Sequence, residues 1–277
     1  MQNPDAGTKM ASDKNYTPCI FCAGKRVGDT RDHYPPRTFF KDKCRPNELV
    51  FPACSLCNGG SSIDDFVIGA VARGYSSSDD DSRAQDIERT FKDVQNYYPM
   101  LLEELRAPLK HPVEEHLTPK DAGVMNLSGP IVSAAIATVG RKLGFALHFH
   151  ATRNFVPVGG GAACVFSTNY ELAKGEVPAF IGKFPGAWET LNQGKFNVAE
   201  QFKYRSVVVE GGEASIHQVA LYDTLVLTIV VVNDVSQGGG HRKEYAMPDW
   251  LAQRGRSARR ERERANKRYR RAMNKKQ

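Results

Sequence analysis

Four of the six cysteines stand in two Cys-x-x-Cys pairs, Cys19 with Cys22 and Cys54 with Cys57. Each pair can form a knuckle that offers two thiolates, and two knuckles complete the tetrahedral shell that zinc prefers. Because four protein ligands leave no open position on the ion, we expect a structural zinc that holds distant segments together and takes no part in catalysis.

Polar residues with other chemistry lie within and just after this frame. Asp32 and His33 adjoin between the two pairs, and Asn58 directly follows the second pair. Neighbouring side chains of an extended strand point to opposite faces, so Asp32 can face a metal while His33 faces a water molecule. Pro35 and Pro36 prevent a helix here and favour an extended chain.

A helix is predicted after the second knuckle. Gly59 and Gly60 make the loop after Asn58 permissive, and Ser62 and Asp65 have the spacing of a capping box. An apolar face follows at helical spacing, formed by Ile63, Phe66, Val67, Ala70 and Val71. The predicted order is therefore knuckle, strand, strand, knuckle, helix.

This order resembles an HNH endonuclease of the ββα-metal nuclease class. The residues that carry the resemblance are Cys19, Cys22, Asp32, His33, Asn47, Cys54, Cys57 and Asn58. The DH…N…CxxCN order is similar to that of endonuclease VII-like members, and the string DHYPPRTFF…PACSLCNGGSSIDD resembles a group of bacterial HNH proteins. The motif covers residues 18–71, about a fifth of the chain.

The resemblance implies a role for each polar residue. His33 would be the general base that activates water, and Asp32 and Asn58 would hold one catalytic divalent ion. Oxygen ligands suit Mg²⁺ or Mn²⁺, and Asn58, where other members have histidine, favours Mg²⁺. Asn47 would brace the loop and orient His33. The implied reaction is hydrolysis of DNA phosphodiester bonds to a 5′-phosphate and a 3′-hydroxyl.

Two other functions stay open at this point. The zinc knuckles could belong to a nucleic-acid-binding protein without catalysis, in which Asn47 is an ordinary turn residue. The nuclease could also act on RNA, although DNA is the expected substrate. The residues give no indication of the oligomeric state.

The positive charge of the chain is concentrated at its C-terminal end. The whole chain has a net charge of +7, whereas residues 254–277 carry twelve Lys/Arg and two Glu, a net of +10. The remainder is therefore acidic, with a net charge of −3. Such a basic block is typical of an arm that binds nucleic acid, and a disordered solubilising tail is the alternative.

The rest of the chain predicts an α+β fold with a mainly antiparallel sheet. A helix is expected over residues 130–150 and strands over Ala162–Thr168, Phe202–Val209 and Ile216–Val232, with a hairpin at Gly211-Gly212. The predicted units are a disordered N-terminus (1–17), the HNH module (18–74), a linker with helices (75–129), the α+β domain (130–250) and the basic tail (251–277).

No segment predicts a membrane span or an exported protein. The most apolar run, Leu225–Val232, is much shorter than the ~20 residues that cross a bilayer, and the N-terminus lacks an apolar signal region. We expect a cytoplasmic protein. Structural or surface roles are expected for the remaining candidates, which are Cys44, Asp64, Asp65, His111, His116, His148, His150 and Cys164.

Overall fold

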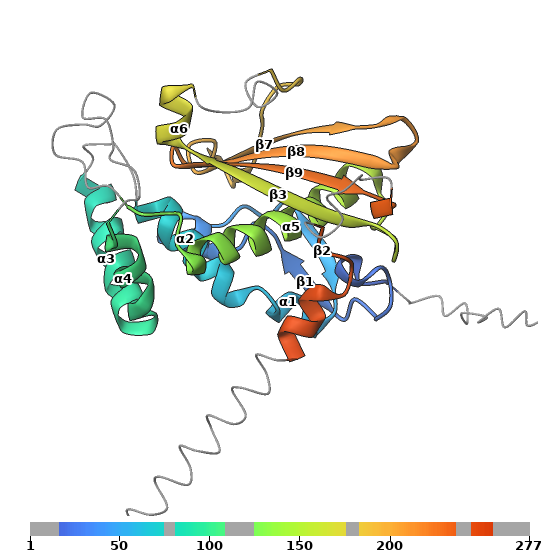
Figure 1. The fold of residues 1–277 in the computed structure, drawn as a ribbon, viewed down its shortest axis with the longest axis horizontal. Helices are drawn as coiled ribbons and strands as arrows, with labels where there is room; N and C mark the ends of the chain where they lie inside the picture. The colour runs from blue at the N-terminus through green and yellow to red at the C-terminus, as the bar shows by residue number, and fades with distance from the viewer. Residues whose placement is uncertain (1–16, 75–80, 109–124, 176–182, 237–244, 257–277) are drawn as a thin grey trace, which may run out of the picture.

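A single long helix, α5 (Pro130–Thr152), lies between the N-terminal module and a five-stranded sheet (Figure 1). The computed structural model describes residues 17–74, 81–108, 125–175, 183–236 and 245–256. Over these residues the chain has an α+β fold with antiparallel sheets, as the sequence predicts. The predicted disordered residues 1–16, and His111 and His116, lie outside the described part of the chain.

The N-terminal module follows the predicted order of elements. Strands β1 (Thr30–His33) and β2 (Val50–Ala53) pair in antiparallel fashion, so that Asp32 lies opposite Phe51 and His33 opposite Val50. Two helices follow β2, namely α1 (Ser55–Gly59) and α2 (Ser62–Gly74). Short 3₁₀ turns fill the connections, at η1 (Ile20–Cys22), η2 (Arg37–Phe39) and η3 (Lys41–Lys43).

Two amphipathic helices, α3 (Asp81–Tyr97) and α4 (Pro99–Arg106), connect the module to α5. Arg73 at the end of α2 binds the carboxylate of Asp86 through two nitrogens, at 2.7 and 3.0 Å. Glu104 of α4 accepts hydrogen bonds from the backbone N–H groups of Ile131 and Val132. Since these are free donors in the first turn of α5, Glu104 acts as the cap of that helix.

The large sheet has the strand order β3-β9-β8-β7-β4. Its strands are β3 (Gly161–Thr168), β4 (Glu189–Thr190), β7 (Phe202–Val208), β8 (Ala214–Leu221) and β9 (Leu225–Val232). The smaller elements around it are α6 (Asn169–Lys174), η5 (Glu210–Gly212) and the hairpin of β5 (Asn192–Gln193) and β6 (Phe196–Asn197).

The sheet confirms one sequence prediction and corrects another. Gly211 and Gly212 adopt positive φ angles of 82° and 74° in the connection between the antiparallel strands β7 and β8, as predicted. The expected continuous strand Ile216–Val232 is wrong, because the chain turns back at 222–224 and separates β8 from β9. Tyr222 lies in that turn with a φ of 52°, a conformation that a non-glycine residue seldom adopts. No glycine marks the turn in the sequence, so the sequence did not predict it.

Two glycines let α5 approach the sheet closely. A Cβ on Gly140 would overlap the thiol of Cys164 on β3, and one on Gly144 would lie 2.6 Å from Cγ2 of Ile229 on β9. The opposite side of α5 packs against α2 and η1. Consequently, one hydrophobic core runs from the cysteine knuckles through α5 to the sheet.

The last described residues, 250–256, form helical turns that belong to the folded body (Figure 1). Leu251 and Ala252 are fully buried, and the Trp250 ring stacks on Phe145 of α5. The first part of the predicted tail, 251–256, is therefore packed, and the remainder of it lies outside the described residues.

Within the described residues, α5 is the one helix with the length and composition to cross a membrane. Of its most apolar window, 67% is buried inside the protein. Core helices of soluble proteins meet the same criterion, because a helix that packs on both sides is apolar on both sides.

Candidate functional site

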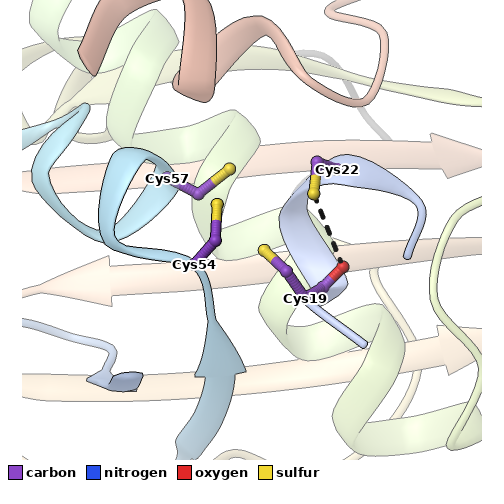
Figure 2. A group of neighbouring side chains, drawn as sticks. All are labelled: Cys19, Cys22, Cys54 and Cys57. Carbon is purple, nitrogen blue, oxygen red and sulfur yellow. Dashed lines mark hydrogen bonds between the residues drawn. The ribbon is translucent and has the colours of Figure 1, made fainter. Parts of the chain in front are cut away.

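The four cysteines of the two pairs converge at one point, as Figure 2 shows. Their Sγ atoms all lie within 4.8 Å of one another, and all four residues are buried. Tetrahedral zinc at about 2.3 Å from each sulfur requires sulfur–sulfur distances of about 3.8 Å. The cluster therefore fits a metal such as zinc, with small side-chain adjustments.

The backbone around the first pair has the form of a knuckle. The N–H of Cys19 bonds to the carbonyl of Arg26 at 2.9 Å, and the N–H of Lys25 bonds to the carbonyl of Cys22 at 3.0 Å. Ala23 and Gly24 turn the chain in the left-handed region, with φ angles of 52° and 70°. The second pair lies at the start of α1, where Cys54 is the residue before the helix.

The neighbouring thiols shift one another's pKa in opposite directions: hydrogen bonds with Cys19 and Cys57 lower the pKa of Cys22, whereas the pKa values of Cys19 and Cys57 are raised. Hydrogen bonds from Cys19 and Cys22, followed by burial, raise the pKa of the Cys57 thiol. Hydrogen bonding to Cys22, together with burial, raises the pKa of Cys19 to about 12. Zinc removes this penalty because it binds the thiolate form, so loading the site would couple metal binding to folding.

Asp32, His33 and Asn58 line one pocket of about 280 Å³. Asp32 is 5% exposed, whereas its neighbour His33 is half-buried and its Nδ1 atom has no hydrogen-bond partner among the described residues. Asn58 sits in α1 and donates from Nδ2 to Oγ1 of Thr30 at 3.1 Å. The three residues are thus brought together by the hairpin and the helix that the cysteine pairs join.

Asn47 is placed elsewhere. It lies in the exposed connection before β2 and is not among the residues that line the pocket. The bracing role that the HNH resemblance implies for it therefore has no support in the geometry and stays a prediction.

A buried lysine from α5 contacts the pocket residue Asp32 but does not itself line the pocket. The ammonium of Lys142 lies 2.8 Å from Oδ2 of Asp32 and donates to Oγ of Ser61 at 2.9 Å. Ser61 in turn donates to Asp65, whose other oxygen accepts a hydrogen bond from the Tyr34 hydroxyl at 2.9 Å. Because Lys142 lies 110 residues from Asp32, no local pattern in the sequence indicates this contact.

Asp65 proves to be more than a helix-capping residue. It is 7% exposed and lines the pocket, and both its oxygens accept hydrogen bonds within the buried network. Burial raises its pKa to about 6, against the opposing effect of the Lys142 charge. Its neighbour Asp64 instead pairs with Arg254 at 2.6 Å, outside the pocket lining.

Three arginines, Arg31, Arg37 and Arg45, surround the pocket. None of them forms an ion pair with a carboxylate among the described residues. Burial, followed by the neighbouring charge of Arg37, lowers the pKa of Arg45, and its Nε atom is buried without a hydrogen-bond partner. These three side chains add positive charge beside the carboxylates of Asp32 and Asp65, and such a concentration of arginines favours binding of an anion.

The same arginines act on His33. Burial, and after it the charges of Arg45 and Arg31, lower the pKa of His33 below its ordinary value, against a smaller opposing effect of Asp32. A lowered pKa favours the neutral imidazole, which is the form that can accept a proton. The sequence contains this signal, because all three arginines lie within fifteen residues around Asp32-His33.

The side-chain oxygens of Asp32 and Asn58, two residues that line the pocket, fit a divalent ion such as Mg²⁺. Lys142 engages only Oδ2 of Asp32, and no described residue donates a hydrogen bond to Oδ1. Asn58 uses its Nδ2 atom toward Thr30, which leaves its side-chain oxygen available. One oxygen from each residue suits an ion that keeps most of its water ligands.

The helical turns at 250–256 are fastened beside this module. Arg254 bonds to Asp64 and to the carbonyl of Gly60, and Arg26, next to the first knuckle, pairs with Asp249. A side chain on Gly60 would overlap the carbonyl of Leu251. The last described residues of the chain therefore lie next to the start of α2.

The remaining candidates have structural surroundings. Cys44 is exposed, and Cys164 packs against Gly140 with its pKa raised to about 12 by burial. His148 is fully buried, and its Nδ1 atom lies 2.8 Å from Oγ of Ser215. His150 contacts the ring of Tyr204 edge-on, far along α5 from Lys142.

Comparisons of this chain with family models, with curated proteins and with solved structures find no match.

Proposed function

We propose that this chain is a metal-dependent endonuclease of the HNH type that hydrolyses phosphodiester bonds in DNA. The observation that carries the proposal is the pocket lined by a histidine, a buried aspartate, an asparagine and three arginines that form no ion pair with a carboxylate of a described residue. A phosphodiester is an anion that arginine binds well through paired N–H donors. Its hydrolysis is accelerated by a general base that takes the proton of the water attacking the phosphorus.

We assign each residue of the pocket a role from its chemical type. Arg31, Arg37 and Arg45 would hold the phosphate oxygens in the pocket, and His33 would take the proton of the attacking water. The water oxygen bonds to phosphorus as the bond to the 3′ oxygen breaks, and that oxygen leaves as a 3′-hydroxyl after it gains a proton from solvent. Asp32 and Asn58 would hold the divalent ion, which supplies charge stabilisation for the leaving oxygen.

The cysteine cluster has a supporting role in this proposal. With zinc bound, it joins the segment before β1 to the start of α1, which carries Asn58. The distance between Asn58 and the β1 residues would then depend on the metal. Catalytic geometry that must hold within about 0.5 Å needs such support.

The proposal is tested by incubating supercoiled plasmid with the purified zinc-loaded protein, with and without Mg²⁺. His33→Ala should lose cleavage at least a hundredfold, since general base catalysis contributes 10²–10⁴-fold. His150→Ala, a histidine on α5 that does not line the pocket, is the matched control and should retain activity.

Each alternative function has its own outcome in this experiment. Salt-sensitive DNA binding with no Mg²⁺-dependent cutting would identify a nucleic-acid-binding protein without catalysis. A digest of RNA beside DNA decides the substrate, and faster His33-dependent cutting of RNA would replace DNA in the proposal. Equal cleavage by wild-type and His33→Ala protein would refute the catalytic assignment.

A further inference from the structure

We propose that Lys142 of α5 is a positioning residue of the nuclease site, which makes the helix of the second half of the chain part of that site. This inference rests on the proposed function. Its basis is the ion pair between Lys142 and Asp32, which is buried on both sides: the two side chains are 1% and 7% exposed.

The surroundings of Lys142 fix the position of its ammonium group. Nζ lies 2.8 Å from Oδ2 of Asp32 and 2.9 Å from Oγ of Ser61, and it stands 4.3 Å from the centre of the Tyr34 ring. Tyr34 and Ser61 are both hydrogen-bonded to Asp65. Residues on β1, α2 and the loop between α1 and α2 therefore converge on one lysine from α5.

Stability alone does not account for a lysine at this position. Several of its neighbours along α5, among them Val139, Leu143, Phe145 and Ala146, are buried apolar residues. Removing two charges from water costs several kcal/mol per ion, and well-packed apolar residues often replace buried ion pairs with no loss of stability. A buried lysine against Asp32 is better explained by what it does to Asp32.

The ion pair determines which oxygen of Asp32 faces the pocket. Because Lys142 holds Oδ2, the carboxylate can offer only Oδ1 to an ion in the pocket. Binding through one oxygen suits Mg²⁺, which demands near-octahedral geometry and keeps several waters. Without Lys142, the carboxylate could rotate and bind an ion through both oxygens, which would shift the ion relative to His33.

The charge of Lys142 has a second consequence. It cancels the charge of Asp32, while Arg31, Arg37 and Arg45 add positive charge at the pocket. The free protein should therefore bind a divalent cation weakly and bind it better once a phosphate is present. Replacing Lys142 with a neutral residue should strengthen cation binding in the free protein and at the same time misplace the ion.

The experiment compares wild type, Lys142→Met and the control Lys195→Met, which removes an exposed charge on the β5–β6 turn. Mn²⁺ affinity is measured by electron paramagnetic resonance on zinc-loaded protein without nucleic acid. We expect Lys142→Met to bind Mn²⁺ at least fivefold more tightly, and Lys195→Met to match wild type. In plasmid cleavage, Lys142→Met should lose at least tenfold in kcat with KM within twofold.

The inference is overturned if folded Lys142→Met protein has both a Mn²⁺ affinity and a kcat within twofold of wild type. It is also overturned if Lys142→Met binds Mn²⁺ more weakly than wild type. If Lys142→Met does not fold, Ser61→Ala removes only the second partner of the ammonium, and it should lower kcat about threefold at unchanged KM. An unchanged kcat in that variant would count equally against the inference.

The inference and the proposed function fail in different ways. If wild-type protein cuts DNA in a His33-dependent manner and Lys142→Met does so equally well, the inference alone fails. If wild-type protein cuts neither DNA nor RNA, the proposed function fails. The Mn²⁺ titration then still reports whether Lys142 controls access of a cation to Asp32, with Asp32→Asn as the variant that should abolish the difference.

Discussion

Loss of one cysteine ligand should release the metal and loosen the module that carries the proposed active site. Cys54 is buried at the junction of β2 and α1, with the other three sulfurs within 4.8 Å. Structural zinc contributes about 10–16 kcal/mol in small zinc domains, so one of four ligands corresponds to about 3–4 kcal/mol. Cys54→Ser should therefore weaken zinc binding by two to three orders of magnitude.

The stability effect follows from the packing of the knuckles. Ile20 and Phe21, between the first two cysteines, are buried in the same core as α5. A loss of about 3–4 kcal/mol lowers the melting temperature of a chain of this size by about 10 °C. Cys44→Ser is the matched control, because Cys44 is exposed and lies outside the cluster.

Two measurements check this prediction. Zinc per chain is determined by mass spectrometry after dialysis against a mild chelator, and unfolding is followed by near-ultraviolet circular dichroism. The reasoning is refuted if Cys54→Ser protein keeps one zinc per chain and melts within 1 °C of Cys44→Ser protein.

Three further predictions follow from the same contacts. Arg45→Met should weaken the binding of non-cleavable DNA about tenfold or more, as measured by fluorescence anisotropy. It should also lower the magnitude of the slope of log affinity against log salt concentration by about 0.9, because one phosphate contact is lost. An unchanged slope would mean that Arg45 does not contact a phosphate. Deleting residues 257–277, which have a net charge of +8, should weaken DNA binding and reduce its salt dependence. The kcat at saturating DNA should stay within about threefold of wild type, because the packed helical turns at 250–256 remain. Loss of kcat would mean that the deleted residues influence the geometry of the site. Burial, followed by the charge of His148, lowers the pKa of His217 to about 3, so its contribution to the free energy of unfolding is complete above pH 6.5 and is lost as the pH drops toward 3. Between pH 7 and pH 5, the free energy of unfolding measured in urea should fall by about 2 kcal/mol more in wild type than in His217→Asn. Equal losses would contradict the lowered pKa.

Local spacing was enough to predict the framework of the site. The interval of two residues within each cysteine pair predicts a knuckle, and the structure brings all four sulfurs together. The extended segment at Asp32-His33 and the helix after Asn58 also follow from nearby residues, namely the two prolines and the apolar spacing of α2. The geometry places Asp32, His33 and Asn58 at one pocket for that reason.

Contacts between distant segments could not be predicted in the same way. Lys142 stands in an apolar helix, where a lone lysine is ordinarily placed at the surface, and its partner Asp32 is 110 residues earlier. Asp65 fits the pattern of a helix start, and that pattern alone does not indicate its buried hydrogen bonds with Ser61 and Tyr34. The contacts of α5 with both the N-terminal module and the sheet are a further example, because no local pattern indicates them.

Charge patterning held information that motif spacing did not use. Arg31, Arg37 and Arg45 flank the Asp32-His33 pair, but their meeting at one pocket depends on the path of the chain through η2 and η3. The overall charge distribution indicates only the C-terminal segment as a site for a polyanion, because most of the positive charge lies there. Asn47 illustrates the opposite case, because a motif position suggested a role that its exposed location does not support.

The most direct test of the central claim is plasmid cleavage by zinc-loaded wild-type protein and by His33→Ala protein, each with Mg²⁺ and with a chelator. The account predicts Mg²⁺-dependent nicking by wild type and at least a hundredfold loss in His33→Ala, with zinc content and melting temperature unchanged. Cleavage that persists in His33→Ala, or that needs no divalent ion, would contradict it.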